Sequence, residues 1–117
     1  MLTIQTGGWA AQRFPNEYIQ ATFADLKNIT RIVTQGRSHY STWVTKYKIS
    51  TSQDGRIFEY ISCGGIACEL DGNSDRNSLV GNEMPAGLAA RVVRLHPIEW
   101  NLAIGMRWAI CGHNADD

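Results

Sequence analysis

The side chains best suited to hold a ligand lie together between positions 37 and 41. Arg37 can hold a carboxylate, sulfate or phosphate through two parallel hydrogen bonds, and Tyr40 offers a flat apolar ring with a hydroxyl at its rim. His39 can donate or accept a hydrogen bond and gains charge as the pH falls toward about 6, while Ser38 and Ser41 add small hydroxyl groups. This composition predicts a binding surface. The alternative is a solvated hairpin whose aromatic side chains lean back on the sheet.

A catalytic site would need a nucleophile beside a base, or two facing carboxylates. His39 and Ser41 are close in sequence, but both lie on an expected turn tip, where nothing would orient them or exclude water. Nothing in the sequence places Cys63 or Cys68 beside a histidine. We therefore expect neither an enzyme nor a cofactor.

The three cysteines leave several interpretations open. Cys63 and Cys68 flank "GGIA", and Cys111 lies near the end of the chain. A lone C-x4-C is a weak metal signal, so buried free thiols are the first interpretation, a disulfide between two of them the second, and metal binding the third. The 71–75 segment "DGNSD" lacks the spacing of a calcium loop, and we expect its side chains to form turns. No metal site is predicted.

Alternation of apolar and polar residues with a period of two indicates strands throughout the chain. The clearest case is 102–110, where the expected apolar face is Leu102, Ile104, Met106, Trp108 and Ile110. Further strands are expected at 17–23, 28–34, 43–50, 56–62, 66–70 and 90–96, with turns at 53–55 and 63–65. Many short strands without helices predict an all-β sandwich or barrel.

Size and charge limit the classes of function. The 117 residues predict one domain, and the eleven basic and eleven acidic residues cancel. This balance argues against a nucleic-acid binder and against a mainly electrostatic attachment to anionic lipid. There is no run of about eighteen apolar residues and no visible signal peptide, so we expect a cytosolic protein or a segment of a longer one.

Six blocks of sequence occur in the order "TQGR", "WVTKYKI", "S-x-DG", "GN-x-D", "AR-x-VR-x-HP-x-EW" and "IGMRW-x-x-x-G". Together they resemble the discoidin domain, also called the coagulation factor 5/8 type C domain, from about Trp9 to Gly112. The resemblance implies one antiparallel jelly-roll β-sandwich of the galactose-binding-like type over residues 1–117, with no chemistry of its own. Within these blocks, Arg107 is expected to bond acidic or carbonyl groups, because a buried arginine must be paired, and His96 is expected to be structural.

The resemblance also implies where ligands bind. In relatives, loops at one end of the sandwich contact phosphatidylserine, collagen, growth-factor tails or galactose-type sugars. Residues 36–43 match the second of these loops, and Arg37 matches an arginine of collagen-binding members. Phe14 and Asn16 lie in a loop whose equivalent helps to line a peptide-tail pocket. The predicted ligand-binding residues are therefore Phe14, Asn16 and 37–41.

The chain departs from the family pattern at its N-terminus. Only eight residues precede Trp9, where the family's first strand and first loop are expected, and the usual pair of terminal cysteines is absent, since His113 follows Gly112. A natural short form, a truncated form, or completion of the sheet by a second chain would each explain this. An uncovered edge strand would favour a homo-oligomer.

These observations predict an adhesion or recognition module for a glycan or an extracellular protein, at the cell surface or outside the cell. A membrane-inserting loop would show two adjacent large apolar residues, and "RSHYST" shows only Tyr40. Binding of anionic phospholipid, a structural subunit completed by a second chain, and a cytoplasmic location remain the alternatives.

Overall fold

The computed structural model describes the backbone of residues 2–11, 18–37 and 41–115, and the side chains of 18–37 and 41–115. Its ten strands are β1 (Leu2–Ala11), β2 (Ile19–Gln35), β3 (Trp43–Ser52), β4 (Glu59–Tyr60), β5 (Ser62–Cys63), β6 (Ile66–Ala67), β7 (Leu70–Asp71), β8 (Val80–Glu83), β9 (Ala89–Asn101) and β10 (Ile104–Asn114). Within these ranges no helix forms that could span a membrane.

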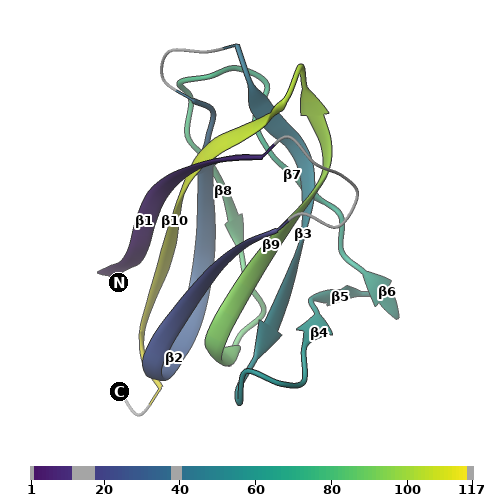
Figure 1. The fold of residues 1–117 in the computed structure, drawn as a ribbon. Coiled ribbons are helices and arrows are strands. Elements are labelled where there is room, and N and C mark those ends of the chain that lie inside the picture. The colour runs from purple at the N-terminus through teal and green to yellow at the C-terminus, as the bar shows by residue number, and fades with distance from the viewer. Residues whose placement is uncertain (1, 12–17, 38–40, 116–117) are drawn as a thin grey trace.

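The strands form an antiparallel β-sandwich (Figure 1). The hydrogen-bonded order is β1-β10-β2-β9-β3-β4, with β8 also on β2, β7 also on β3, and β5–β6 as a separate pair. The two layers share β2, which pairs with β9 through residues 19–28 and with β10 through residues 27–35. Figure 1 shows β2 doubling back at the lower end, where its register with β9 shifts between Thr22 and Lys27. The all-β sandwich is confirmed, and the strands expected at 17–23 and 28–34 are the two halves of β2.

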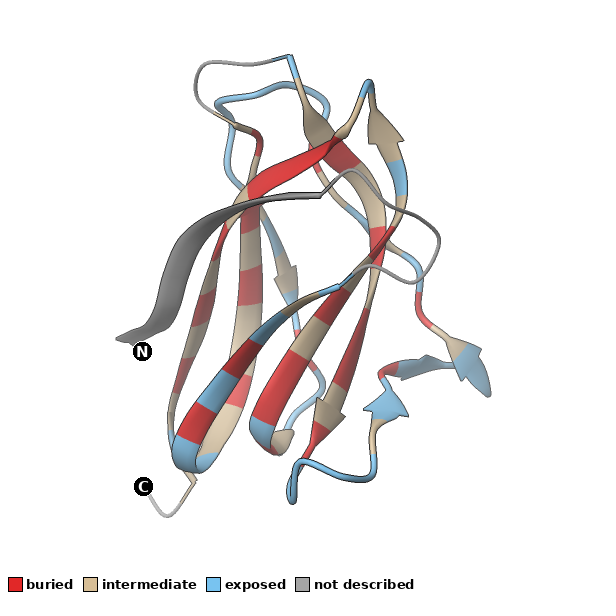
Figure 2. Cartoon of the chain, in the orientation of Figure 1, coloured by how far each residue is buried: buried red, intermediate tan, exposed pale blue. Residues whose placement is uncertain are grey.

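The core lies between the layers and follows the period of two (Figure 2). Fully buried side chains come from four long strands and include Ile32, Tyr47, Leu95, Met106 and Ile110. Burying an aliphatic side chain of this size contributes about 1.5–3 kcal/mol, so these alternating positions hold the two layers together.

The apolar face expected at 102–110 is confirmed for four of its five residues and is wrong for Leu102. Ile104, Met106, Trp108 and Ile110 are buried, whereas Leu102 is 81% exposed. Leu102 lies in the turn between β9 and β10 with a φ of 64°, a left-handed conformation. The alternation ends where the chain must reverse, because a turn residue no longer follows the pleat of the strand.

The region between β3 and β8 is less regular than expected. The strand expected at 56–62 contains only β4 and the start of β5, and that at 66–70 only β6 and the start of β7. The tight turn expected at 53–55 is instead a longer loop, in which Ser52 Oγ accepts from Gly55 N (2.7 Å) and Asp54 Oδ1 accepts from Arg56 N and Ile57 N (2.8 and 3.0 Å). Side chains that bond the backbone in this way compete with strand pairing. The turn at 63–65 is confirmed between β5 and β6.

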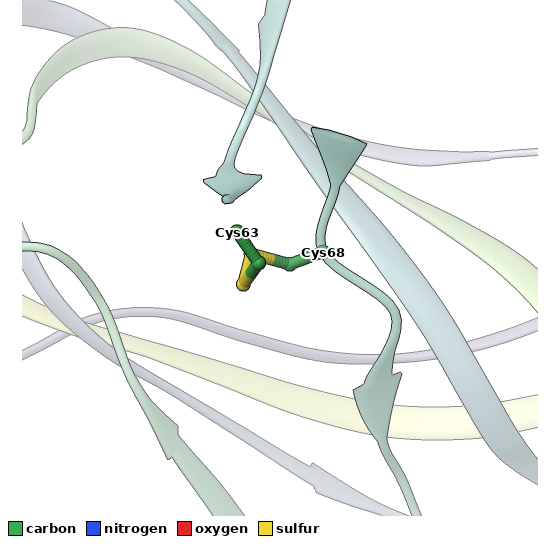
Figure 3. Close-up of a disulfide and its surroundings, with 2 residues drawn as sticks. All are labelled: Cys63 and Cys68. Carbon is green, nitrogen blue, oxygen red and sulfur yellow. A yellow bond between two sulfur atoms is a disulfide. The ribbon is translucent and has the colours of Figure 1, made fainter. Parts of the chain in front are cut away.

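A disulfide joins Cys63 to Cys68 across the β5–β6 hairpin (Figure 3). The preferred interpretation of free thiols is therefore wrong for Cys63 and Cys68. Cys111 is a free thiol, and it is half-buried. The hairpin brings the two Cα atoms within 5.0 Å, inside the range that a disulfide spans.

The N-terminal segment covers the edge of β10. β1 pairs with β10 from Leu2↔Gly112 to Ala11↔Ile104, so the chain itself covers this edge of β10. The end of the strand order on this side is β1 itself. A second chain that extended the sheet here would pair with β1.

Candidate functional site

The segment that carries the predicted ligand residues connects β2 to β3 at one end of the sandwich, the upper end in Figure 1. A hydrogen bond from Arg37 N to the Thr42 carbonyl oxygen (3.1 Å) joins the two ends of this segment. Of the seven predicted contact residues, the structure describes Arg37, which is half-buried, and Ser41, which is exposed. The other five, Phe14, Asn16, Ser38, His39 and Tyr40, lie outside the described residues.

Arg107 holds the base of this segment. Its Nε donates to the Gly36 carbonyl oxygen (2.7 Å) and its Nη2 donates to the Arg76 carbonyl oxygen (3.0 Å). The expectation that Arg107 bonds carbonyl groups is therefore confirmed. One guanidinium connects β10, the 36–42 segment and the 72–79 loop.

Glycines allow the close packing that this arrangement needs. A Cβ on Gly36 would lie 2.6 Å from the Arg76 Cα, so only glycine lets the two backbones approach this closely. A Cβ on Gly105 would overlap the Arg37 side chain at its Cδ and lie 2.7 Å from Thr42 Oγ1. The aliphatic part of Arg37 is therefore packed across β10 rather than extended into solvent.

The 72–79 loop is held by its own side chains, as expected for "DGNSD". Asn73 is buried, and its Nδ2 donates to the carbonyl oxygens of Thr34 (3.0 Å) and Ser78 (2.8 Å). Asp75 Oδ1 accepts from Ser78 N (2.6 Å) and Asn77 N (2.9 Å). These bonds, that to Ser78 foremost, lower the pKa of Asp75 below its usual value. The turn-forming interpretation is confirmed.

Sequence reasoning missed the 101–103 turn, which adjoins the 36–42 segment. Asn101 Nδ2 donates to the Ser41 carbonyl oxygen (2.8 Å), and Ala103 N donates to the Asn101 carbonyl oxygen (2.7 Å). The exposed Leu102 stands between them. The signal that could have located this turn is Asn101 itself, since asparagine favours turns.

The F5/8 type C domain family matches residues 3–110 of the chain. The chain belongs to this family. Members are non-catalytic binding modules that often form part of larger enzymes.

Individual relatives support the same assignment. Coagulation factor VIII of the dog is 34% identical over 111 residues, which is 92% of this chain and 5% of that protein. The wild-type discoidin II structure from Dictyostelium discoideum has a TM-score of 0.81 at 27% identity and covers 92% of this chain and 41% of that one. A Clostridium perfringens module solved in complex with GalNAc-β-1,3-galactose shares the fold at 17% identity, with a TM-score of 0.58 over 90% of this chain and 94% of that one. The chain thus spans less than half the length of factor VIII and of discoidin II.

Proposed function

We propose that this domain is an adhesion or recognition module that binds a carbohydrate at the end of the sandwich formed by the 36–42 segment and the 101–103 turn. The observation that carries the proposal is the hydrogen bond from Asn101 Nδ2 to the Ser41 carbonyl oxygen, which ties the two loops together. Tied loops lose less conformational entropy on binding than free ones. An extracellular protein with similar polar groups would fit the same surface.

Residue types favour a sugar. The ring of Tyr40 can stack on a sugar face, while Arg37, Asn16 and the hydroxyl groups at 38 and 41 can hold sugar hydroxyls. His39 and Phe14 complete the proposed contact set. The bacterial module of similar fold carries a GalNAc-β-1,3-galactose disaccharide, which makes that sugar a suitable first probe.

The test measures binding of GalNAc-β-1,3-galactose and of collagen to the purified domain and to Arg37→Ala and Tyr40→Ala. Loss of a hydrogen-bonding or stacking group at the site is expected to weaken binding by about tenfold. Arg56→Ala is the matched control, because Arg56 is exposed on the β3–β4 loop. If both site variants bind as tightly as the wild type, the ligand does not contact this end of the sandwich.

Leu102 favours a second candidate, attachment to a phosphatidylserine surface. Its side chain is 81% exposed at the tip of the 101–103 turn, where an apolar group could insert into a bilayer. Leu102→Ser would then reduce binding to phosphatidylserine vesicles, whereas Ile66→Ser, at a residue that is 73% exposed on β6, would not. Equal binding by the two variants would exclude insertion of Leu102.

Two further proposals concern the domain organisation of the chain and its location relative to the cell. We infer that residues 1–117 act as one domain, since the layers share one core and the bacterial module of similar fold has a comparable extent. An extracellular or cell-surface location is supported by the Cys63–Cys68 disulfide, because disulfides persist in oxidising compartments. Homo-oligomer formation through β1 is tested by the sedimentation coefficient of the purified domain.

A further inference from the structure

A hollow lies over β3, β4 and β9 on the side of the sandwich. It has a volume of about 420 Å³, and its lining includes Tyr18, Lys48, Tyr60, His96 and Trp100. His96 precedes the end of β9 at Asn101 by five residues, which corresponds to about 16 Å along a strand. Trp100, which also lines the hollow, directly precedes Asn101, so the hollow runs along β9 from His96 toward the 101–103 turn.

The register of three strands brings these side chains together on the outer face of one layer. Lys48 pairs with His96, and Ser50 pairs both with Arg94 on β9 and with Tyr60 on β4. The intervening residues Ile49 and Leu95 are buried in the core, so the paired residues face outward. The strand pairing thus brings Lys48, His96 and Tyr60 together.

His96 occupies the middle of the cluster in a fixed orientation. Its Nε2 is 2.7 Å from Ser50 Oγ, and its ring centroid is 5.5 Å from that of Tyr18 and 5.2 Å from that of Tyr60. This bond agrees with the expectation of a satisfied histidine. His96 and Ser50 do not form a catalytic pair, because Ser50 is only 3% exposed and its hydroxyl is not accessible to a substrate.

Two cations border the aromatic rings of the hollow. Lys48 Nζ lies 5.8 Å from the Tyr60 ring centroid, and the Arg94 guanidinium lies 4.4 Å from that of Tyr18. Within the described part of the chain neither cation forms an ion pair, and none of the described lining residues is acidic. Among the described residues, the hollow thus combines exposed rings with the positive charge of Lys48, whereas the Arg94 guanidinium beside it donates to Gln20 Oε1 (2.8 Å) and also lies over the Phe58 ring.

We propose that this hollow is a second ligand site, which binds an acidic saccharide through its carboxylate. Aromatic rings pack against the apolar face of a pyranose ring, and a lysine beside them attracts the sugar's carboxylate. A volume of about 420 Å³ lies within the range of small-molecule sites and accommodates one or two sugar units. Tyr18 and Tyr60, which are 39% and 49% exposed, are the stacking surfaces, and Lys48 is the anion contact.

The test titrates the domain with a hyaluronan tetrasaccharide, which carries glucuronate, and with its carboxyl-reduced form, which is neutral. The acidic probe is expected to bind about tenfold more tightly than the neutral one, and this preference is expected to vanish in Lys48→Gln. Tyr60→Ala is expected to weaken the binding of both probes. Arg91→Gln is the matched control, since it removes one positive charge from an exposed position on β9.

Several outcomes would overturn the proposal. These are equal binding of the two probes by the wild type, no binding at all, equal effects of Lys48→Gln and Arg91→Gln, or tighter binding of a poly-glutamate peptide than of the tetrasaccharide. The melting temperature of each variant shows that it is folded. Arg37→Ala and Leu102→Ser are expected to leave hyaluronan binding unchanged, so failure of the side site and failure of the proposed end site give different results.

Discussion

Replacement of Arg107 by glutamine should loosen the end of the sandwich, because this one side chain joins three segments. Its bonds to the Gly36 and Arg76 carbonyl oxygens measure 2.7 and 3.0 Å. Hydrogen bonds to charged groups contribute about 1.5–3 kcal/mol each, and the half-buried position of Arg107 reduces their sum to about 2–3 kcal/mol. For 117 residues, an unfolding entropy of about 2.1 cal/mol/K per residue converts this loss into a melting temperature lowered by about 8–12 °C.

Calorimetry and urea unfolding of Arg107→Gln measure this loss, and Arg107→Lys separates charge from geometry. Lysine keeps the charge but cannot reach two carbonyl oxygens with a planar fork, so it is expected to recover at most about half of the stability. Arg91→Gln, at an exposed position, is expected to change stability by less than about 0.5 kcal/mol. The reasoning is refuted if Arg107→Gln is as stable as this control, or if Arg107→Lys is as stable as the wild type.

Three further predictions concern stability. Burial raises the pKa of Tyr47 to about 12, so the folded state favours the neutral phenol and stability should fall as the pH rises above about 10. In urea unfolding between about pH 8 and 11, the Tyr47→Phe variant should show a smaller fall. The same variant should lose about 1 kcal/mol of stability at neutral pH. Burial lowers the pKa of His96 below 6.5, so the unfolded chain binds the proton more tightly than the folded one. The free energy of unfolding should therefore decrease as the pH drops below 6.5. A His96→Gln variant whose stability falls with pH in the same way would contradict this. Loss of the Cys63–Cys68 disulfide in the double serine variant should cost about 2 kcal/mol from chain entropy over a separation of five residues, as measured by urea unfolding with and without reductant.

The strands were predictable because each long one alternates between a core and a solvent face. Met106, Trp108 and Ile110 illustrate this, since burial of every second residue is a local requirement that the sequence displays directly. The role of Arg107 was predictable for a related reason. A guanidinium within an apolar strand must find acceptors, and backbone carbonyl oxygens are the ones available.

The turns and cross-strand contacts were less predictable, because they depend on partners far apart in the chain. Leu102 matched the apolar pattern of β10 and proved to be exposed, since β9 extends to Asn101 and the chain must reverse there. The disulfide followed from a hairpin at two glycines, which brings Cys63 and Cys68 together. Neither outcome has an unambiguous signal within a short window of sequence.

The amino-acid sequence alone determined that this protein is an all-β sandwich of the F5/8 type C family. Its prediction that the 37–41 segment is a binding surface stays a prediction. Only the tertiary structure decided that the 101–103 turn joins that segment through the Asn101–Ser41 hydrogen bond, and that Tyr18, Tyr60, Lys48 and His96 form one hollow. The physical reason is that periodic burial is encoded along a strand, residue by residue. Which side chains meet across strands depends on register, and register is set by the packing of the whole sandwich.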